Sequence, residues 1–289
     1  MLHSRPALLA PVLFLFLLPG CGEVVAGGGG GGPSVGQRYE LMLAAQDEIE
    51  ASANAFTVAG IGLPPGVTLP VACSDTSSTA DADGDGVPTN ATFTFTNPPC
   101  SITGVRGGTL GLTGSIQVQD ASSGNNTAWS TTLTNLAWQA TDSGNTRTYT
   151  ATRNGTRARG IGTGGKATLI TAVTTIQDRP NVVDATVDVQ LTTSFTPAAG
   201  STLTPDQPPP SGTLILLGTI RWRRSSEDWQ LDVGTITPLV YDSTCAGPQR
   251  ITAGQLALSG TVHNQDGTLT LAWSACGTDP ARSWTPSGS

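Results

Sequence analysis

The sequence predicts a mainly β fold: a large antiparallel sheet of about ten strands with one N-terminal helix packed on it. Glycine and proline are frequent, with 36 and 20 among 289 residues, and aromatic residues make up 5%. Such a composition is typical of many short strands joined by turns. Apolar and polar residues also alternate with a period of two, which gives a strand one apolar and one polar face. Because open sheet edges invite aggregation, we expect the sheet to be curled, barrel-like or folded into a sandwich.

The alternation is clearest over residues 183–192, where five apolar residues face one way and five polar residues the other. Similar patterns predict strands at 92–96, 110–119 and 213–223, and on both sides of a turn at 264–267. One polar face per strand implies that the sheet covers a core on one side. The residues expected on the apolar faces are Leu110, Leu112, Ile116, Val118, Val183, Ala185, Val187, Val189, Leu191, Leu214, Leu216, Ile220, Trp222, Leu256, Leu258, Val262, Leu269, Leu271 and Trp273.

Turn residues separate these segments. Asn264-Gln-Asp-Gly267 lies between two alternating runs, which predicts a hairpin. Further turns are predicted at Asn154-Gly155, at residues 178–181 and at residues 225–228. The proline-rich segment 204–210 is expected to be a loop that joins two halves of the sheet.

Residues 37–56 (QRYELMLAAQDEIEASANAF) predict an amphipathic helix. The segment is rich in helix formers and contains neither glycine nor proline. Its apolar residues Leu41, Ala45, Ile49 and Ala53 recur close to a 3.6-residue period. We expect this apolar stripe to pack on the sheet.

The first residues predict export. Arg5 precedes an apolar run from Ala7 to Leu18, which is too short for a membrane span of roughly 20 residues and has the length of a signal-peptide core. The run ends in Leu18-Pro19-Gly20-Cys21, which resembles the lipobox of bacterial lipoproteins. The resemblance implies that the Cys21 thiol receives a diacylglyceryl group, that the chain is cut before Cys21 and that the new amine is acylated. The alternative is an ordinary secretory signal with a cysteine near its end.

A flexible tether follows Cys21. Residues 27–32 are six consecutive glycines, which have no side chains to bury and maximal backbone freedom. We therefore predict a lipoprotein signal peptide (1–20), a tether (21–36) and a single β-rich domain with an N-terminal helix (37–289). The membrane is the expected partner, through the N-terminal lipid. Residue 22 is glycine and not aspartate, which by the sorting pattern of enterobacterial lipoproteins implies the outer membrane, facing the periplasm or the cell surface.

The charge balance argues against nucleic acid as a partner. Removal of residues 1–20 takes away one of the 14 basic residues and no acid, which leaves 13 basic against 21 acidic residues. Nucleic-acid binding needs clustered positive charge. We therefore expect no nucleic-acid partner, and the sequence identifies no particular protein or ligand partner.

Four cysteines follow Cys21, and we predict that they form two disulfides. An even number of cysteines in an exported chain indicates disulfides, and four allow three pairings. We favour Cys73–Cys100 and Cys245–Cys276, because each pair closes a local loop. Their spacings match no compact zinc site.

The segment Asp81-Ala-Asp-Gly-Asp-Gly-Val87 predicts a metal site. Its alternate aspartates converge if the backbone winds as a turn, which glycine at the intervening positions permits. Oxygen ligands suit a hard cation such as calcium. The segment resembles the start of the EF-hand loop and of the calcium repeats of thrombospondins, which implies ligands from the side chains of Asp81, Asp83 and Asp85 and from the carbonyl of Val87.

The resemblance covers about seven residues. Thr92 stands where an EF-hand has its bidentate glutamate, so calcium would need Asp75, Asn90 or a more distant carboxylate. The alternative is a solvated acidic turn, in which water screens the repulsion between the three carboxylates. Any calcium here is expected to be structural, since no nucleophile–base pair is apparent nearby.

Three other patterns have simpler explanations than chemistry. Residues 160–166 fit the G-x-x-x-x-G-K of a phosphate-binding loop, but Ala167 replaces its serine or threonine, so we predict a flexible glycine turn. His263 is expected on a surface turn. Asp184 and Asp188 share a strand face and could form a glycosidase pair, although the alternation of polar residues explains them without catalysis.

Arginines gather around two of the predicted turns. Those near Asn154-Gly155 and those near residues 225–228 could bind an acidic glycan or a lipid headgroup. Charge that protects a sheet edge is the simpler interpretation. The arginines concerned are Arg147, Arg153, Arg157, Arg159, Arg221, Arg223 and Arg224.

Two functional classes follow from these observations. The first is a membrane-anchored exported lipoprotein with a non-catalytic structural or binding role. The second is a carrier or chaperone that holds an apolar ligand or lipid inside a curled sheet, as outer-membrane lipoprotein-insertion proteins do, by analogy of architecture. A carrier predicts an apolar cavity between the sheet and the helix. An enzyme is a third class, for which the sequence offers no convincing catalytic constellation.

Overall fold

The computed structural model describes the chain between residues 45 and 288, with gaps. The described residues all belong to one unit, Gly31–Ser289. The predicted signal peptide (1–20) and tether (21–36) lie outside them. The described ranges are 45–46, 48–53, 55–56, 74–77, 80–103, 109–120, 128–141, 148–161, 165–179, 182–204, 207–245, 250–262 and 264–288.

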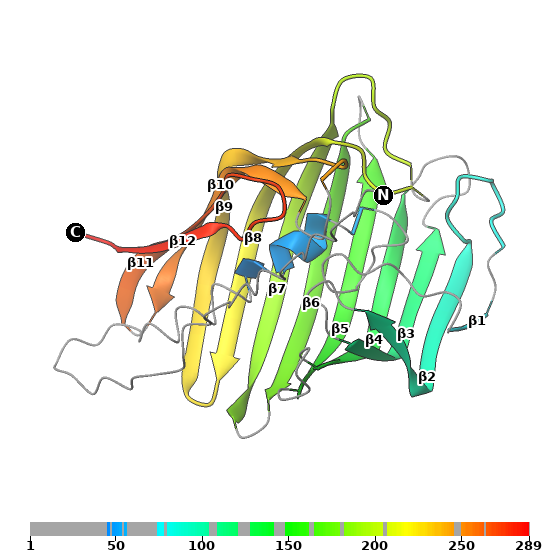
Figure 1. Cartoon of the computed structure of the whole chain (residues 1–289), viewed down its shortest axis with the longest axis horizontal. Coiled ribbons are helices and arrows are strands. Elements are labelled where there is room, and N and C mark those ends of the chain that lie inside the picture. Colours follow the sequence, from blue (N-terminus) through cyan, green and yellow to red (C-terminus); the bar gives the residue numbers. More distant parts are fainter. Residues whose placement is uncertain are drawn as a thin grey trace, which may run out of the picture. The chain divides into compact units, whose positions relative to one another are not determined.

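In the described part of the chain, twelve strands form one antiparallel sheet, which confirms the predicted fold class. The strands are hydrogen-bonded in chain order from β1 to β12, and the sheet is not closed. Figure 1 shows them side by side. The strands are β1 (Asp75–Thr76), β2 (Asn90–Thr103), β3 (Thr109–Asp120), β4 (Trp129–Thr141), β5 (Thr148–Ile161), β6 (Ala167–Arg179), β7 (Val182–Pro197), β8 (Gly212–Arg224), β9 (Glu227–Tyr241), β10 (Ile251–Val262), β11 (Gln265–Trp273) and β12 (Ala281–Pro286).

The buried face of the sheet follows the predicted alternation in most strands. In β8, Leu214, Leu216 and Trp222 are buried, whereas Ile215 between them is exposed. Trp222 stacks on Trp229 of β9, with ring centroids 4.5 Å apart. Burial of a leucine side chain such as that of Leu216 stabilises the fold by about 1.5–3 kcal/mol. The other residues predicted for the core that are buried are Leu112, Ile116, Val118, Ala185, Val187, Val189, Leu191, Ile220, Leu256, Leu258, Val262, Leu269, Leu271 and Trp273.

The helix predicted over residues 37–56 is observed at residues 45–53, apart from residue 47, which is not described. The part of its apolar stripe that is described, Ala45, Ile49 and Ala53, is buried. The intervening polar side chains are buried as well, so the prediction of one apolar and one solvated face is wrong. These polar residues are Gln46, Glu48, Glu50 and Ser52, each at most 5% exposed.

The helix is buried on all sides because the sheet curls around it. The Glu48 carboxylate pairs with Arg153 of β5, and Gln46 accepts a hydrogen bond from Arg282 of β12. These strands are seven places apart, which in a flat sheet with strands about 4.8 Å apart would separate them by about 34 Å. A helix about 10–12 Å wide reaches both because the sheet is curved. No helix in the described residues is long and apolar enough to cross a membrane.

The predicted turn at Asn154-Gly155 is wrong, because both residues lie inside β5. Gly155 has a φ of 138°, and a Cβ atom there would lie 2.2 Å from the carbonyl oxygen of Ala172. The Asn154 side-chain oxygen accepts a 2.7 Å hydrogen bond from the amide of Asn135, beside a shift of register between β4 and β5. The pair therefore marks a kink in a long strand, where a bulge and a glycine let the sheet bend.

The other predicted turns are confirmed. Residues 178–181 and 225–228 contain the reversals between β6 and β7 and between β8 and β9. The hairpin of β10 and β11 also forms, but Val262 pairs with Gln265. Residues 265–267 of that predicted turn therefore already belong to β11.

Candidate metal loop and buried arginine cluster

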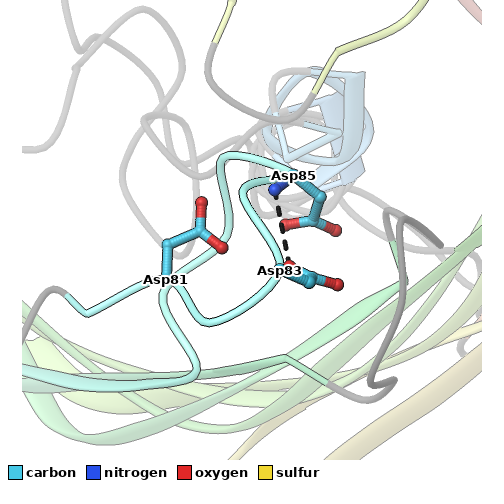
Figure 2. A group of neighbouring side chains, drawn as sticks. All are labelled: Asp81, Asp83 and Asp85. Carbon is cyan, nitrogen blue, oxygen red and sulfur yellow. Dashed lines mark hydrogen bonds between the residues drawn. The ribbon is translucent and has the colours of Figure 1, made fainter.

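The acidic loop, residues 81–87, lies between β1 and β2 and brings its three aspartates together, as predicted. One carboxylate oxygen from each of Asp81, Asp83 and Asp85 lies within 4.8 Å of the others. Gly84 and Gly86 have positive φ values of 77° and 89°, which allow the backbone to wind this tightly. Figure 2 shows the three side chains along this winding, with the Asp85 amide donating to the Asp83 carboxylate.

Hydrogen bonds within the loop hold it in this form. The Asp81 carboxylate accepts bonds from the amides of Gly84 (2.8 Å) and Gly86 (2.9 Å), and Asp85 accepts one from the amide of Val87 (2.8 Å). The bond from Gly86 is the main reason that the pKa of Asp81 lies below its usual value. The Val87 side chain is buried in the core and so fixes the end of the loop on the sheet.

Asp85 is the loop carboxylate in the least favourable electrostatic environment. Burial raises its pKa, and repulsion by Asp83, Asp120 and Asp81 raises it further. Its Oδ2 atom is buried and has no hydrogen-bond partner in the described part of the chain. Asp120 at the end of β3, which the sequence analysis did not single out, is thus a fourth carboxylate near the loop. A cation would relieve this repulsion, as would the positive charge of Arg159, which interacts electrostatically with Asp85.

Asp75 and Asn90, which were expected to complete a calcium site, lie on different strands. Asp75 lies in β1, where it pairs with Thr94 of β2. Asn90 begins β2, and its side-chain oxygen accepts a 3.1 Å bond from Gln117. Among the described carboxylates, Asp120 therefore has the clearest electrostatic connection to the loop.

One predicted disulfide is confirmed. Cys245 and Cys276 are bonded, with their Cα atoms 5.8 Å apart, a normal separation for a disulfide. The bond closes a loop across 31 residues and would contribute about 3–4 kcal/mol in the chain-entropy model. Cys21 and Cys73 and the side chain of Cys100 lie outside what the structure describes, so lipidation and the Cys73–Cys100 disulfide stay predictions.

A second polar site lies on the buried face of β5, where the sequence analysis placed edge-protecting charge. Arg153 is buried and donates to the Glu48 carboxylate of the helix and, through Nε, to the Thr175 hydroxyl of β6 at 3.0 Å. Its guanidinium also lies 5.0 Å from the centre of the Trp138 ring, a favourable cation–π distance. Arg153 thus joins the helix to three strands.

The next two arginines along this face differ from Arg153. Arg157 and Arg159 are 0% and 3% exposed, and none of their side-chain nitrogens has a hydrogen-bond partner among the residues that the structure describes. The closest described counter-charge to Arg157 is Glu48, at 3.8 Å. Burial lowers the pKa of each arginine to about 10, so both guanidinium groups remain charged at neutral pH. The clue in the sequence is that all three arginines occupy odd-numbered positions and so share one strand face.

Two of the three arginines of β8 lie at the surface, whereas Arg224 is half-buried with its guanidinium 5.0 Å from the centre of the Trp222 ring. Arg221 pairs with Asp228, and Arg223 pairs with Asp188 of β7. Asp188 also accepts a 2.7 Å bond from the Thr174 hydroxyl. These exposed pairs account for Asp188 without a catalytic role.

The last two predicted features are the lookalike of a phosphate-binding loop at residues 160–166 and His263. Gly160 and Ile161 end β5, and Lys166 precedes β6, so the lookalike of a phosphate-binding loop spans the reversal between two antiparallel strands. A phosphate-binding loop instead joins a strand to a helix. His263 lies outside the described residues.

The fold and the site define a class of protein by geometry: an open antiparallel sheet curled around a short buried helix that is held by charged residues. The chain matches no protein-family model, and comparison with curated proteins and with solved structures gave no significant match.

Proposed function

We propose that this chain is a lipid-anchored exported protein whose β domain has a non-catalytic binding or structural role. The observation that carries the proposal is the sequence Leu18-Pro19-Gly20-Cys21 at the end of an apolar run, followed by a glycine tether. Each acyl methylene buried in a membrane contributes about 0.8 kcal/mol, so several chains on Cys21 anchor stably. The Cys245–Cys276 disulfide supports export, because disulfides persist in oxidising compartments.

The anchor is tested by the substitution Cys21→Ser in the full-length chain. We expect the wild-type protein to sediment with membranes and to incorporate labelled fatty acid, and the variant to do neither. A second variant, Gly22→Asp, keeps the acylated cysteine and should stay membrane-bound while moving to the inner membrane. Continued sedimentation and labelling of Cys21→Ser would overturn the proposal.

The second part of the proposal is that the acidic loop binds a structural calcium ion. Its support is the approach of three carboxylate oxygens within 4.8 Å and the pKa of Asp85, which burial raises first and repulsion from its neighbours raises further. Asp81, Asp83 and Asp85 would supply side-chain oxygens and Val87 its carbonyl, with Asp120 the closest further carboxylate. The ion would offset the repulsion between these groups and hold the loop on the core.

Thermal unfolding with calcium and with a chelator tests this site. Binding to the folded state stabilises it by about 2.7 kcal/mol at a calcium concentration of one hundred times Kd, so the midpoint should rise. Asp83→Asn should abolish the rise, whereas Asp188→Asn, on the outer face of β7, should retain it. Since the pKa of Asp85 is raised, protons compete with calcium, and the rise should vanish as pH falls through that pKa. An unchanged midpoint in millimolar calcium would leave the loop as an acidic turn.

The alternative function is a carrier for an apolar ligand or lipid. It is supported by the apolar buried face of β8 to β11, where leucine, isoleucine, valine and tryptophan predominate. The turn that follows the helix already packs near this face, since the Phe56 ring lies 5.4 Å from that of Phe195 on β7, which in turn lies 6.3 Å from that of Tyr241 on β9, so a carrier would have to move this segment to admit its ligand. Lipid extracted from the purified protein at one molecule per chain would favour the carrier. Its absence would favour the structural or binding role.

A further inference from the structure

We propose that Arg157 and Arg159 form a buried binding site for an oxyanion, the phosphate or carboxylate group of a ligand. The inference rests on the binding role proposed above and does not depend on lipidation. Both guanidinium groups lie on the buried face of β5, and all six of their side-chain nitrogens are shielded from solvent. Among described residues, none of these nitrogens has a hydrogen-bond partner.

A buried guanidinium group without hydrogen bonds is strongly unfavourable, because it has lost its water and formed no charge-assisted hydrogen bonds in return. Arg153 shows how the same strand satisfies such a group, with a carboxylate, a hydroxyl and an aromatic ring. Arg157 and Arg159 have no equivalent set of contacts. We therefore expect the folded state to retain two such cations only if a further anion neutralises them.

The described carboxylates do not balance the charge. Glu48 uses Oε1 for Arg153, while Oε2 lies 3.8 Å from Arg157. Asp85 acts on Arg159 electrostatically and forms no ion pair with it. In the described part of the chain, Glu48 is therefore the only carboxylate that forms ion pairs with these three buried guanidinium groups, while Asp85 of the acidic loop acts on Arg159 without an ion pair.

Further hydrogen-bonding groups surround the two arginines on the same face of the sheet. Arg157 pairs in register with Thr171 of β6, and Arg159 pairs with Trp129 of β4. Cross-strand neighbours lie about 5 Å apart. The Thr171 hydroxyl and the Trp129 indole nitrogen are buried and, like the guanidinium groups, have no hydrogen-bond partner. The Thr193 hydroxyl, one strand beyond β6, is in the same state.

This set of groups selects an oxyanion. The guanidinium and indole nitrogens only donate hydrogen bonds, and a threonine hydroxyl can donate one. Guanidinium forks match the geometry of phosphate and carboxylate oxygens. A cation would be repelled, and a neutral polar ligand would leave the charge uncompensated. The anion could be free in solution or could be the headgroup of an amphiphile whose chains lie on the apolar part of the buried face.

The test is thermal unfolding of the purified wild-type protein in non-ionic detergent. Inorganic phosphate is titrated against sodium chloride at constant ionic strength, and dioctanoyl phosphatidic acid against neutral dioctanoylglycerol. We expect the midpoint to rise by about 5–10 °C at one hundred times Kd. A rise with both phosphate compounds indicates a free oxyanion as ligand, and a rise with phosphatidic acid alone indicates a headgroup. No rise with either would overturn the proposal.

Substitutions assign the response to this site. Arg157→Met and Arg159→Met should abolish it, while Arg221→Met, at an exposed position on β8, should keep the full wild-type response. Without ligand, Arg157→Met should unfold at the same or a higher temperature, because an apolar side chain replaces a guanidinium group without hydrogen bonds while Glu48 keeps its pair with Arg153. If either methionine variant fails to fold, the isosteric Thr171→Val should still show a smaller response than wild type. A wild-type response in both methionine variants would contradict the proposal, whatever the result with Cys21→Ser.

Discussion

Strands β5 and β8 belong to the same sheet, but their buried faces are held by different forces. The buried face of β8 consists of Leu214, Leu216, Ile220 and Trp222, and its packing is apolar. That of β5 has Ala151 followed by three arginines, and its contacts to the helix are ionic. Both strands lie in one curved sheet, but the inward side chains of β8 need apolar neighbours, whereas the inward arginines of β5 need partners of opposite charge.

Backbone pairing in this sheet therefore does not depend on an apolar interior. β5 keeps full antiparallel pairing with β6 while it buries charge. Removal of an apolar group from β8 should cost stability in proportion to the volume lost. Removal of one partner from the ionic contacts of β5 should leave the other partner buried and uncompensated. The following substitutions separate the two regions.

The largest effect is expected for Glu48→Gln. The substitution preserves shape but removes the carboxylate that faces Arg153 and Arg157, so it should cost about 3–5 kcal/mol in the free energy of unfolding. Urea denaturation measures the change, with Asp232→Asn on the exposed side of β9 as the control. A loss below about 1 kcal/mol would mean that the buried arginines do not depend on Glu48.

Leu216→Ala tests the apolar region and should cost about 3 kcal/mol, since Leu216 is fully buried and its removal leaves a cavity. The loss should not change with salt concentration. The matched control is Leu217→Ala, because Leu217 is the next residue on the same strand and is 57% exposed. Equal losses for the two leucines would contradict the assignment of the buried face.

Thr175→Val tests the hydrogen bonds of one hydroxyl in the charged region. Valine has nearly the same shape but can neither accept the bond from Arg153 Nε nor donate the 3.4 Å bond to Glu48 Oε1, so the expected loss is about 1–3 kcal/mol. Thr171→Val is the matched control on the same strand, because the Thr171 hydroxyl is buried without a partner. In ligand-free protein that control should be neutral or stabilising. A larger loss at Thr171 than at Thr175 would reverse the proposed difference between the two hydroxyls.

The smallest effect is expected for Arg223→Met on the outer face of β8. Its ion pair with Asp188 is partly exposed, and such pairs typically contribute less than about 1 kcal/mol. High salt should screen even this contribution. A loss as large as that of Glu48→Gln would show that burial does not distinguish the arginines of β5 from those of β8.

Strands β5 to β8 show how much of the fold could be predicted from the sequence. In β7 and β8, alternation marks the buried face directly, and the predicted core residues whose side chains are described are confirmed. β6 has apolar residues on both faces, since Leu169 and Val173 are buried with Thr171 and Thr175 whereas Ile170 and Ile176 are exposed, so apolar periodicity does not identify its buried face. In β5 the buried face is charged, and Asn154-Gly155 has a sequence typical of a turn although it lies inside the strand. Single-residue hydropathy cannot detect a strand whose inward side chains are neutralised by distant partners.

The candidate sites follow a similar division. The approach of Asp81, Asp83 and Asp85 was predictable because it depends on a few consecutive residues and two glycines. The presence of Asp120 beside them was not, because it follows from the pairing of β2 with β3. The contact of Glu48 with the β5 arginines depends on how the whole sheet curves. Local sequence therefore predicts the loop, and tertiary structure is needed for the arginine cluster.

The contact between Gln46 and Arg282 has a consequence for the order of folding. The sheet is built from neighbouring strands, whose pairing involves short-range contacts and forms without large loop-closure entropy. The helix is different, since Gln46 and Arg282 are 236 residues apart. This hydrogen bond can form only after the last described strand has emerged from the ribosome. The helix is thus synthesised before every strand of the sheet and completes its docking after all of them, so a chain that ends before β12 would lack part of the helix's attachment.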